Sequence, residues 1–439
     1  MFSRRTGWNL SSNRLARAVE ERRRAGGGIL DLTISNPTIA GIPYPSDEIA
    51  RALAGAATHL YEPDPRGLRE SREAIVHWYA GRGLVVDPDA VVLTSSTSEA
   101  YAWLFKLLCD PGDRVLVPFP SYPLFEFLAT LECVTADPYP LRYEGRWELD
   151  RDALVAALGN ASETDPAYSS AASPGRPAPP GRLALPDRPA PPGRPDPPGA
   201  AASPAGSVRA VVLVNPNNPT GSFVSASDLE FLSALTAPRG LPIISDEVFS
   251  SYPLEPQPSP TGGAAARSVL ATTDVPAFVL DGLSKACGLP GMKAGWIIVL
   301  GPPDFRARAL ARLEVVADTY LSVGTAVQRA LPRLLELGAT ISSAIRARTS
   351  ANLAFLRSAP SARSPVQALR VEGGWSAVLR LPRTRSEETW CLDLLQGDGV
   401  LVQPGWFFDF ESEAYLVVSL LCPEPVFREG ITRILKRVS

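Results

Sequence analysis

The stretch AFVLDGLSKACGLPGMKAGWIIV, residues 277–299, contains two short apolar segments on either side of a loop with one lysine, Lys285. The segments 277–280 and 296–299 are typical of buried β-strands. Small residues around Lys285 leave room for a flat ring near the backbone, and a lysine at a strand end can form an imine with an aldehyde cofactor. A lone lysine is more often a solvated surface residue, so this interpretation needs support from the rest of the chain.

Apolar strands of the same kind alternate with helical segments through most of the chain. The strands that precede the stretch are 91–94, 114–117, 211–214 and 242–245, and a helix is expected from Ser98 to Leu108. This alternation is typical of a parallel sheet covered by helices. Strands that are apolar at every position are buried on both faces, so the sequence predicts an α/β fold with a mostly parallel sheet flanked by helices.

The pattern changes after about residue 302, where long helices precede further strands. The expected elements are 304–316, 326–356, 377–381 and 416–420. We therefore assign residues 46–300 to a large domain, and residues 301–439 to a linking helix and a smaller α+β domain. Residues 1–45 are expected to form an arm that packs on the smaller domain.

Residues 160–207 are crowded with Pro, Ala, Gly and Arg, and the segment Arg176–Arg182 is repeated at Arg188–Arg194. Such a composition cannot bury a core, so the segment is expected to be disordered or polyproline-like. One interpretation is a docking site for a proline-recognising domain. We favour an insertion tolerated at the surface, because lengthening a loop costs little entropy per added residue.

The composition is that of an ordinary globular protein. The 439 residues are 45% hydrophobic and 20% charged with a net charge of −3, which favours two domains and gives no sign of a nucleic-acid partner. No apolar run reaches the roughly 20 residues that cross a bilayer, and the start lacks a signal peptide, so we expect a cytoplasmic protein without membrane contact. Five scattered cysteines predict free thiols, and only two histidines argue against a metal site.

Two polar segments follow other predicted strands. The loop NPNNPTG, residues 215–221, comes directly after strand 211–214, and Asp246 follows strand 242–245. Ligands of open α/β sheets collect at the carboxyl ends of the strands. The loop could also be an ordinary turn, and Asp246 could instead cap the next helix.

The segment TSSTSEA, residues 94–100, joins a strand to a helix. Hydroxyl groups and free backbone N–H groups at a helix N-terminus make an anion site. The same residues also satisfy a capping box between Ser96 and Glu99, and both interpretations can hold together.

Together these segments resemble the motifs of class I/II aminotransferases, which are fold type I enzymes that depend on pyridoxal phosphate (PLP). The resemblance runs from about Leu30 to the C-terminus, and the order and spacing of the motifs agree. It implies a large domain with a seven-stranded sheet and a smaller α+β domain. It also implies that the chain moves an amino group between an amino acid and a 2-oxo acid.

The resemblance implies the roles of three residues at the reacting centre. Lys285 would hold pyridoxal 5′-phosphate as an imine and act as the catalytic base at the substrate Cα. Asp246 would pair with the pyridine nitrogen and keep it protonated, so that the ring can accept electrons. Asn218 would donate to the phenolic oxygen of the ring and also touch the substrate.

Five further residues surround this centre in the resemblance. Ser96 and Thr97 would bind the phosphate, and Tyr122 would stack on the pyridine ring. Tyr61 would reach the phosphate of the neighbouring subunit, which implies a homodimer with shared active sites. Asn36 would line the substrate side.

The chain departs from the family pattern at two cofactor positions. Phe249 stands where the family has a tyrosine that donates to the phenolic oxygen, so we expect the imine to stay protonated over a wide pH range. Lys293 replaces an arginine that grips the phosphate; a lysine keeps the charge and loses the two-pronged geometry.

A third departure concerns the substrate. Val417 falls where the family has the arginine for the substrate α-carboxylate, and a valine cannot form a bidentate ion pair. Either another cation takes this role or the substrate is held differently. Candidate cations are Arg380, Lys293, Arg4 and Arg5.

Two rival functions remain open at this point. A carbon–sulfur β-lyase, or another eliminating enzyme, would use the same residues but release ammonia without an amino acceptor. A non-catalytic, ligand-sensing relative would keep the fold; the presence of Lys285, Asp246 and Asn218 argues against it.

Overall fold

The structure is a computed structural model that describes residues 2–8, 10–55, 59, 61, 63–159, 206–255, 268–271, 275–361 and 363–438. The Pro-rich insertion predicted at 160–207 lies outside the described residues except for its last two positions.

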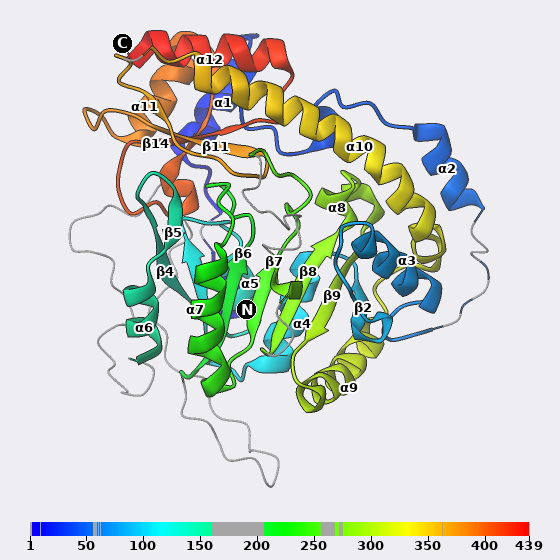
Figure 1. The fold of residues 1–439 in the computed structure, drawn as a ribbon. Helices are drawn as coiled ribbons and strands as arrows, with labels where there is room; N and C mark the ends of the chain where they lie inside the picture. The colour runs from blue at the N-terminus through cyan, green and yellow to red at the C-terminus, as the bar shows by residue number, and fades with distance from the viewer. Residues whose placement is uncertain are drawn as a thin grey trace.

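An eight-stranded sheet forms the centre of the molecule, in the order β2-β9-β8-β7-β6-β3-β4-β5 (Figure 1). Its strands are β2 (Val91–Thr94), β3 (Arg114–Phe119), β4 (Thr135–Tyr143), β5 (Trp147–Leu149), β6 (Val208–Val214), β7 (Ile243–Asp246), β8 (Ala277–Gly282) and β9 (Gly295–Leu300). Two strands, β9 and β5, run in the direction opposite to the other six strands of this sheet. The resemblance implied seven strands, which is wrong by one, because the short strand β5 pairs with the edge of β4 and extends the sheet.

Both faces of this sheet are buried, as the apolar strands predicted. In β6, Val211 and Leu213 face one hydrophobic cluster, whereas Val212 and Val214 face the other, because side chains alternate along a strand. One face is covered by α4 (Thr97–Leu108), α5 (Phe125–Leu131) and α9 (Pro303–Tyr320). The other is covered by α3 (Arg69–Ala80), α6 (Arg151–Gly159), α7 (Ala226–Thr236), α8 (Leu283–Ala286) and α10 (Thr325–Ser358). The predicted α/β fold is confirmed.

A second, antiparallel sheet of four strands has the order β10-β11-β14-β13. These strands are β10 (Gln367–Ala368), β11 (Ser376–Arg380), β14 (Tyr415–Ser419) and β13 (Gln403–Pro404). Helices α11 (Glu387–Asp393) and α12 (Glu424–Val438) share its hydrophobic cluster. In the N-terminal part, β1 (Leu30–Asp31) pairs with β12 (Val400–Leu401), α1 (Arg14–Arg24) contacts α11, and the short turn Arg4–Thr6 contacts α5.

The 34-residue helix α10 runs from the helices that cover the large sheet to those that pack on the second sheet (Figure 1). It packs on α3 and on α2 (Ser46–Ala54) in one part and on α12 in another. Pro332 lies inside the helix, and a proline cannot donate to the carbonyl group four residues earlier. That carbonyl, of Gln328, accepts a hydrogen bond from the Ser71 hydroxyl of α3 instead, at 2.7 Å.

The predicted free thiols are confirmed for all five cysteines, of which Cys287, Cys391 and Cys422 are buried. Among the described residues, no helix combines the length and apolar character needed to cross a membrane.

Candidate active site

The polar loops predicted to bind a ligand follow neighbouring strands of the large sheet. The register pairs Val214 of β6 with Asp246 of β7, and Asp246 with Leu280 of β8. Because these strands are parallel, the segments that follow them leave the sheet at the same edge. The structure therefore brings the Asn-rich loop, Asp246 and the Lys285 segment together.

Lys285 lies in the short helix α8, and its side chain faces aromatic rings. The Nζ atom lies 5.7 Å from the ring centre of Phe249 and 5.1 Å from that of Trp375. The Tyr252 hydroxyl donates to the Lys285 carbonyl oxygen at 2.5 Å, which fixes the backbone. Burial lowers the pKa of Lys285, and the negative charge of Asp246 opposes this shift. A lysine in these surroundings loses its proton more readily than one in water.

Asp246 is buried, with 8% of its surface exposed. Its carboxylate accepts hydrogen bonds from the Tyr101 hydroxyl at 3.2 Å and from the Val248 N–H at 3.3 Å. Burial raises the pKa of Asp246 to about 6, although both hydrogen bonds and the charge of Lys285 favour the ionised form. Sequence reasoning missed Tyr101; its one signal was a hydroxyl on an otherwise apolar face of helix α4.

The loop after β6 is anchored by one asparagine and presents the next. The Asn217 amide donates to the carbonyl oxygen before Ser121 and to the Thr220 hydroxyl, both at 2.9 Å, and its oxygen accepts from the Ser121 hydroxyl at 3.0 Å. Asn218 is half-buried, and its oxygen accepts from the Ser376 hydroxyl of the second sheet at 3.3 Å. The loop thus touches both sheets.

The start of α4 has the geometry of a capping box and remains available to an anion. The Ser96 hydroxyl accepts from the Glu99 N–H at 3.2 Å, and the Glu99 carboxylate accepts from the Ser95 N–H at 2.6 Å. Thr97 is the first residue of the helix. A Cβ atom at Gly295 would lie 3.3 Å from the Ser96 backbone, so the start of β9, which follows the Lys285 loop, passes close to this helix end.

Tyr122 and Lys293 lie on the exposed side of this region. Tyr122 is 39% exposed and contacts Phe125 edge-on; burial, and then the charge of Asp246, raise its pKa, which puts Tyr122 near Asp246. Lys293 is exposed, has a left-handed backbone with φ of 53°, and makes no ion pair within the described residues.

Two predicted site residues, Asn36 and Tyr61, form no hydrogen bond or ion pair with Lys285, Asp246 or Asn218 in the described part of the chain. The Asn36 oxygen accepts from the N–H and hydroxyl groups of Thr38, which is a local turn. Tyr61 is 69% exposed and borders a small cavity with Trp103 and Gln328. Their predicted contacts with substrate and with a second subunit stay predictions.

The position of the missing arginine is apolar. Val417 is 1% exposed and belongs to a hydrophobic cluster with Val378, Phe408 and Phe410. Close by, the Ser121 N–H donates to the Phe408 carbonyl oxygen at 3.0 Å.

The proposed substitute cations are engaged elsewhere or exposed. The Arg380 guanidinium donates to the Gln367 side chain, and that of Arg5 donates to the Leu131 carbonyl oxygen. Arg4 is exposed, as is Lys293. In the part of the chain that the structure describes, none of these four is bonded to Asn218 or Lys285.

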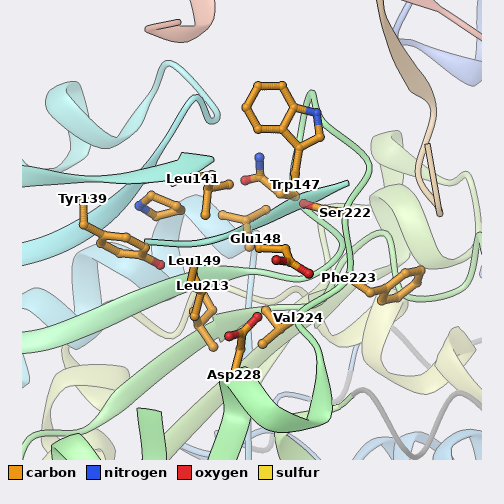
Figure 2. A pocket seen from close by; sticks show the side chains of 13 residues that line it. Tyr139, Leu141, Trp147, Glu148, Leu149, Leu213, Ser222, Phe223, Val224 and Asp228 are labelled. Carbon is orange, nitrogen blue, oxygen red and sulfur yellow. The ribbon is translucent and has the colours of Figure 1, made fainter. Parts of the chain in front are cut away.

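A small cavity lies behind the Asn-rich loop, and Asn217 is one of the residues that line it. It measures about 20 Å³, room for one water molecule, and Figure 2 shows it bordered by Tyr139, Trp147, Phe223 and Asp228. Neither Asp246 nor Lys285 lines it. Residues of β5 and β6 line it together with residues of the loop after β6.

The arrangement fits a flat, anionic, electrophilic cofactor. The carboxylate of Asp246 is buried, and its charge acts on the amine of Lys285, whose pKa is lowered by burial. The α4 N-terminus lies next to Gly295 at the start of β9, and a helix N-terminus attracts an anion. These are the groups that a phosphorylated pyridine aldehyde would need.

Fold and site together define a fold type I transferase, with the ligand-binding loops at the carboxyl edge of a mostly parallel sheet. The chain belongs to the family described as aminotransferase class I and II, which matches residues 28–434. It is therefore an aminotransferase, as the motifs predicted.

Individual relatives agree at low identity. The glutamate–pyruvate aminotransferase AlaA of Haemophilus influenzae is 23% identical over 94% of this chain and 91% of its own length. A tyrosine aminotransferase of Caenorhabditis elegans is 23% identical over 92% of this chain and 77% of its own. Among solved structures, the alanine aminotransferase of Pyrococcus furiosus has a TM-score of 0.77 at 22% identity, covering 100% of this chain and 99% of that one.

Proposed function

We propose that Lys285 anchors pyridoxal 5′-phosphate and then moves the proton of the transamination reaction. The observation that supports this proposal is that a half-buried lysine, Lys285, and a buried carboxylate, Asp246, follow neighbouring strands at one sheet edge, where the charge of each shifts the pKa of the other. When bound, the cofactor supplies an electron sink for the carbon that loses its proton.

The lowered pKa of Lys285 supports its role as a base. As a free amine, Lys285 would take the proton from the substrate Cα and hold it for the second proton transfer, while the cofactor, when bound, would supply the electron sink. The Tyr252 hydroxyl donates to the Lys285 carbonyl oxygen, which fixes the backbone from which the amine extends.

The remaining roles are those that the family resemblance implies, and the positions of the side chains support them. Asp246 holds a proton on the pyridine nitrogen, and Tyr101 keeps that carboxylate oriented. The helix start at Ser96 and Thr97 binds the phosphate, with Lys293 as a flexible cation. Asn218 donates to the ring oxygen, and Tyr122 stacks on the ring.

Two copies of the chain would complete the site. Tyr61 is exposed, as are Val315 and Tyr320 of α9, which supports a homodimer in which Tyr61 reaches the phosphate in its partner. Asn36 would contact the substrate.

Lys285→Ala tests the proposal. We expect turnover with amino acid and 2-oxo acid pools to fall by about a thousandfold or more, because the base is lost, while the variant still takes up free cofactor. Lys106→Ala is the matched control, since Lys106 pairs with Glu132 on the surface. Full transamination by Lys285→Ala would contradict the assignment.

A further inference from the structure

Trp375 carries a buried hydrogen-bond donor that the described chain does not use. The residue is 3% exposed, and its Nε1 atom has no acceptor among the described residues. Buried polar groups nearly always have a partner, and an exception calls for a ligand or a water molecule. The donor belongs to a ring whose centre lies 5.1 Å from the Lys285 amine.

The indole ring is held in place from several sides. It makes edge-on contacts with Phe249, at 5.2 Å between ring centres, and with Tyr252, at 5.0 Å. The backbone carbonyl oxygen of Trp375 accepts a hydrogen bond from the N–H of Leu420, the residue directly after β14, at 2.7 Å. A ring fixed in this way cannot turn its N–H toward a distant partner.

The segment before Trp375 is clamped to the loops of the large sheet. The Gly373 N–H donates to Gly221 at 2.8 Å, and the Gly374 N–H donates to Tyr252 at 2.9 Å. Gly221 has a φ of 70°, and a Cβ atom there would lie 2.6 Å from the Gly373 oxygen. The two segments can therefore approach this closely only because position 221 is a glycine. The next residue, Ser376, donates to Asn218.

The arginine that in the family would pair with the substrate carboxylate is replaced by a valine. Val417 is enclosed in an apolar cluster. Within the described residues, Asp246 is the one charged group that shifts the pKa of Lys285. Uncharged N–H or O–H groups would therefore have to donate hydrogen bonds to the oxygen that the substrate carries on the carbon next to its amino carbon.

We propose that Trp375 is a substrate-contacting residue whose indole N–H donates to an oxygen on the carbon next to the reacting amine. The substrates are then amino compounds whose carboxylate or carboxamide oxygen is recognised by neutral donors. This inference rests on the proposed function, because it uses Lys285 to locate the reacting amine. It follows that the site separates an acid from its amide only weakly, since a neutral N–H has no charge with which to favour the anion.

Calorimetry of the holoenzyme with 3-phenylpropanoate and 3-phenylpropanamide tests the inference. Neither compound has an amine, so neither can react. We expect the two dissociation constants to agree within about tenfold, and Trp375→Phe to weaken both by about fivefold to tenfold, the effect of one hydrogen bond. Bound cofactor, read from its absorbance before each titration, should be unchanged, so that failure of the cofactor site is detected separately.

Trp390→Phe is the matched control. Trp390 is 4% exposed and its Nε1 atom also lacks an acceptor among the described residues, but it belongs to the cluster of the second sheet. We expect this variant to bind both ligands normally. Binding of the acid alone, an unchanged affinity in Trp375→Phe, or no binding of either ligand would overturn the inference.

Discussion

The two sides of the site differ in how they are built. On the large-sheet side, Asn217 makes three side-chain hydrogen bonds and Asp246 accepts two. On the second-sheet side, Val417 is enclosed by apolar side chains and the indole of Trp375 keeps an unused donor. The polar groups named on the first side are therefore satisfied within the folded chain, whereas the second side, among the described residues, leaves one buried donor free for a ligand.

Asp246→Asn should show the largest effect on the polar side. An amide cannot hold the pyridine nitrogen protonated, so we expect kcat to fall by about 100-fold, typical of the loss of one electrostatic stabiliser. Steady-state kinetics would measure it. Asp228→Asn is the control, because Asp228 is also buried and pairs with Arg151. An equal loss of kcat in both variants would show that the effect of Asp246→Asn is not specific to the site.

Asn217→Ala should come next, through stability. Three hydrogen bonds are lost from a buried residue, so we expect the free energy of unfolding to fall by about 2–3 kcal/mol. The neighbour Asn218 makes one long bond, and Asn218→Ala should cost less than about 1 kcal/mol. Urea unfolding of the cofactor-free protein would measure both; similar losses would show that the loop is not anchored through Asn217.

Tyr101→Phe should show the smallest effect, and it depends on pH. Burial raises the pKa of Asp246 to about 6, so cofactor uptake should be full above that pH and should be lost as the pH falls through it. The Tyr101 hydroxyl stabilises the ionised carboxylate; without it the pKa rises, and the loss begins at higher pH. At pH 6 we expect uptake to weaken about threefold to tenfold. An unshifted profile, read from bound-cofactor absorbance, would remove Tyr101 from the site.

The polar side could be predicted from the sequence because each of its parts is local. Ser96 and Glu99 are three residues apart, and their capping box is present in the structure. Asp246 and Lys285 each follow an apolar strand, and parallel strands deliver such residues to one edge. Strand ends therefore place these residues at one edge of the sheet, and the family resemblance supplies their expected roles.

The second side could not be predicted because it depends on distant pairs. Trp375 meets Phe249 and Lys285 across about 90 to 126 positions of sequence and no local pattern separates it from a core tryptophan. Tyr101 similarly looks like one more buried residue of a helix. The eighth strand, β5, has only three residues, which is too short for a clear alternation.

The proline in α10 has a mechanical consequence for the distance between the two sheets. Pro332 lies beside the anchoring contact with Ser71, and helices bend most readily where a proline interrupts the backbone ladder. From there to Ser358 the helix extends about 39 Å at 1.5 Å per residue. A rotation of the helix by about 5° at Pro332 would displace its end at Ser358 by about 3 Å, a distance comparable to the length of one hydrogen bond.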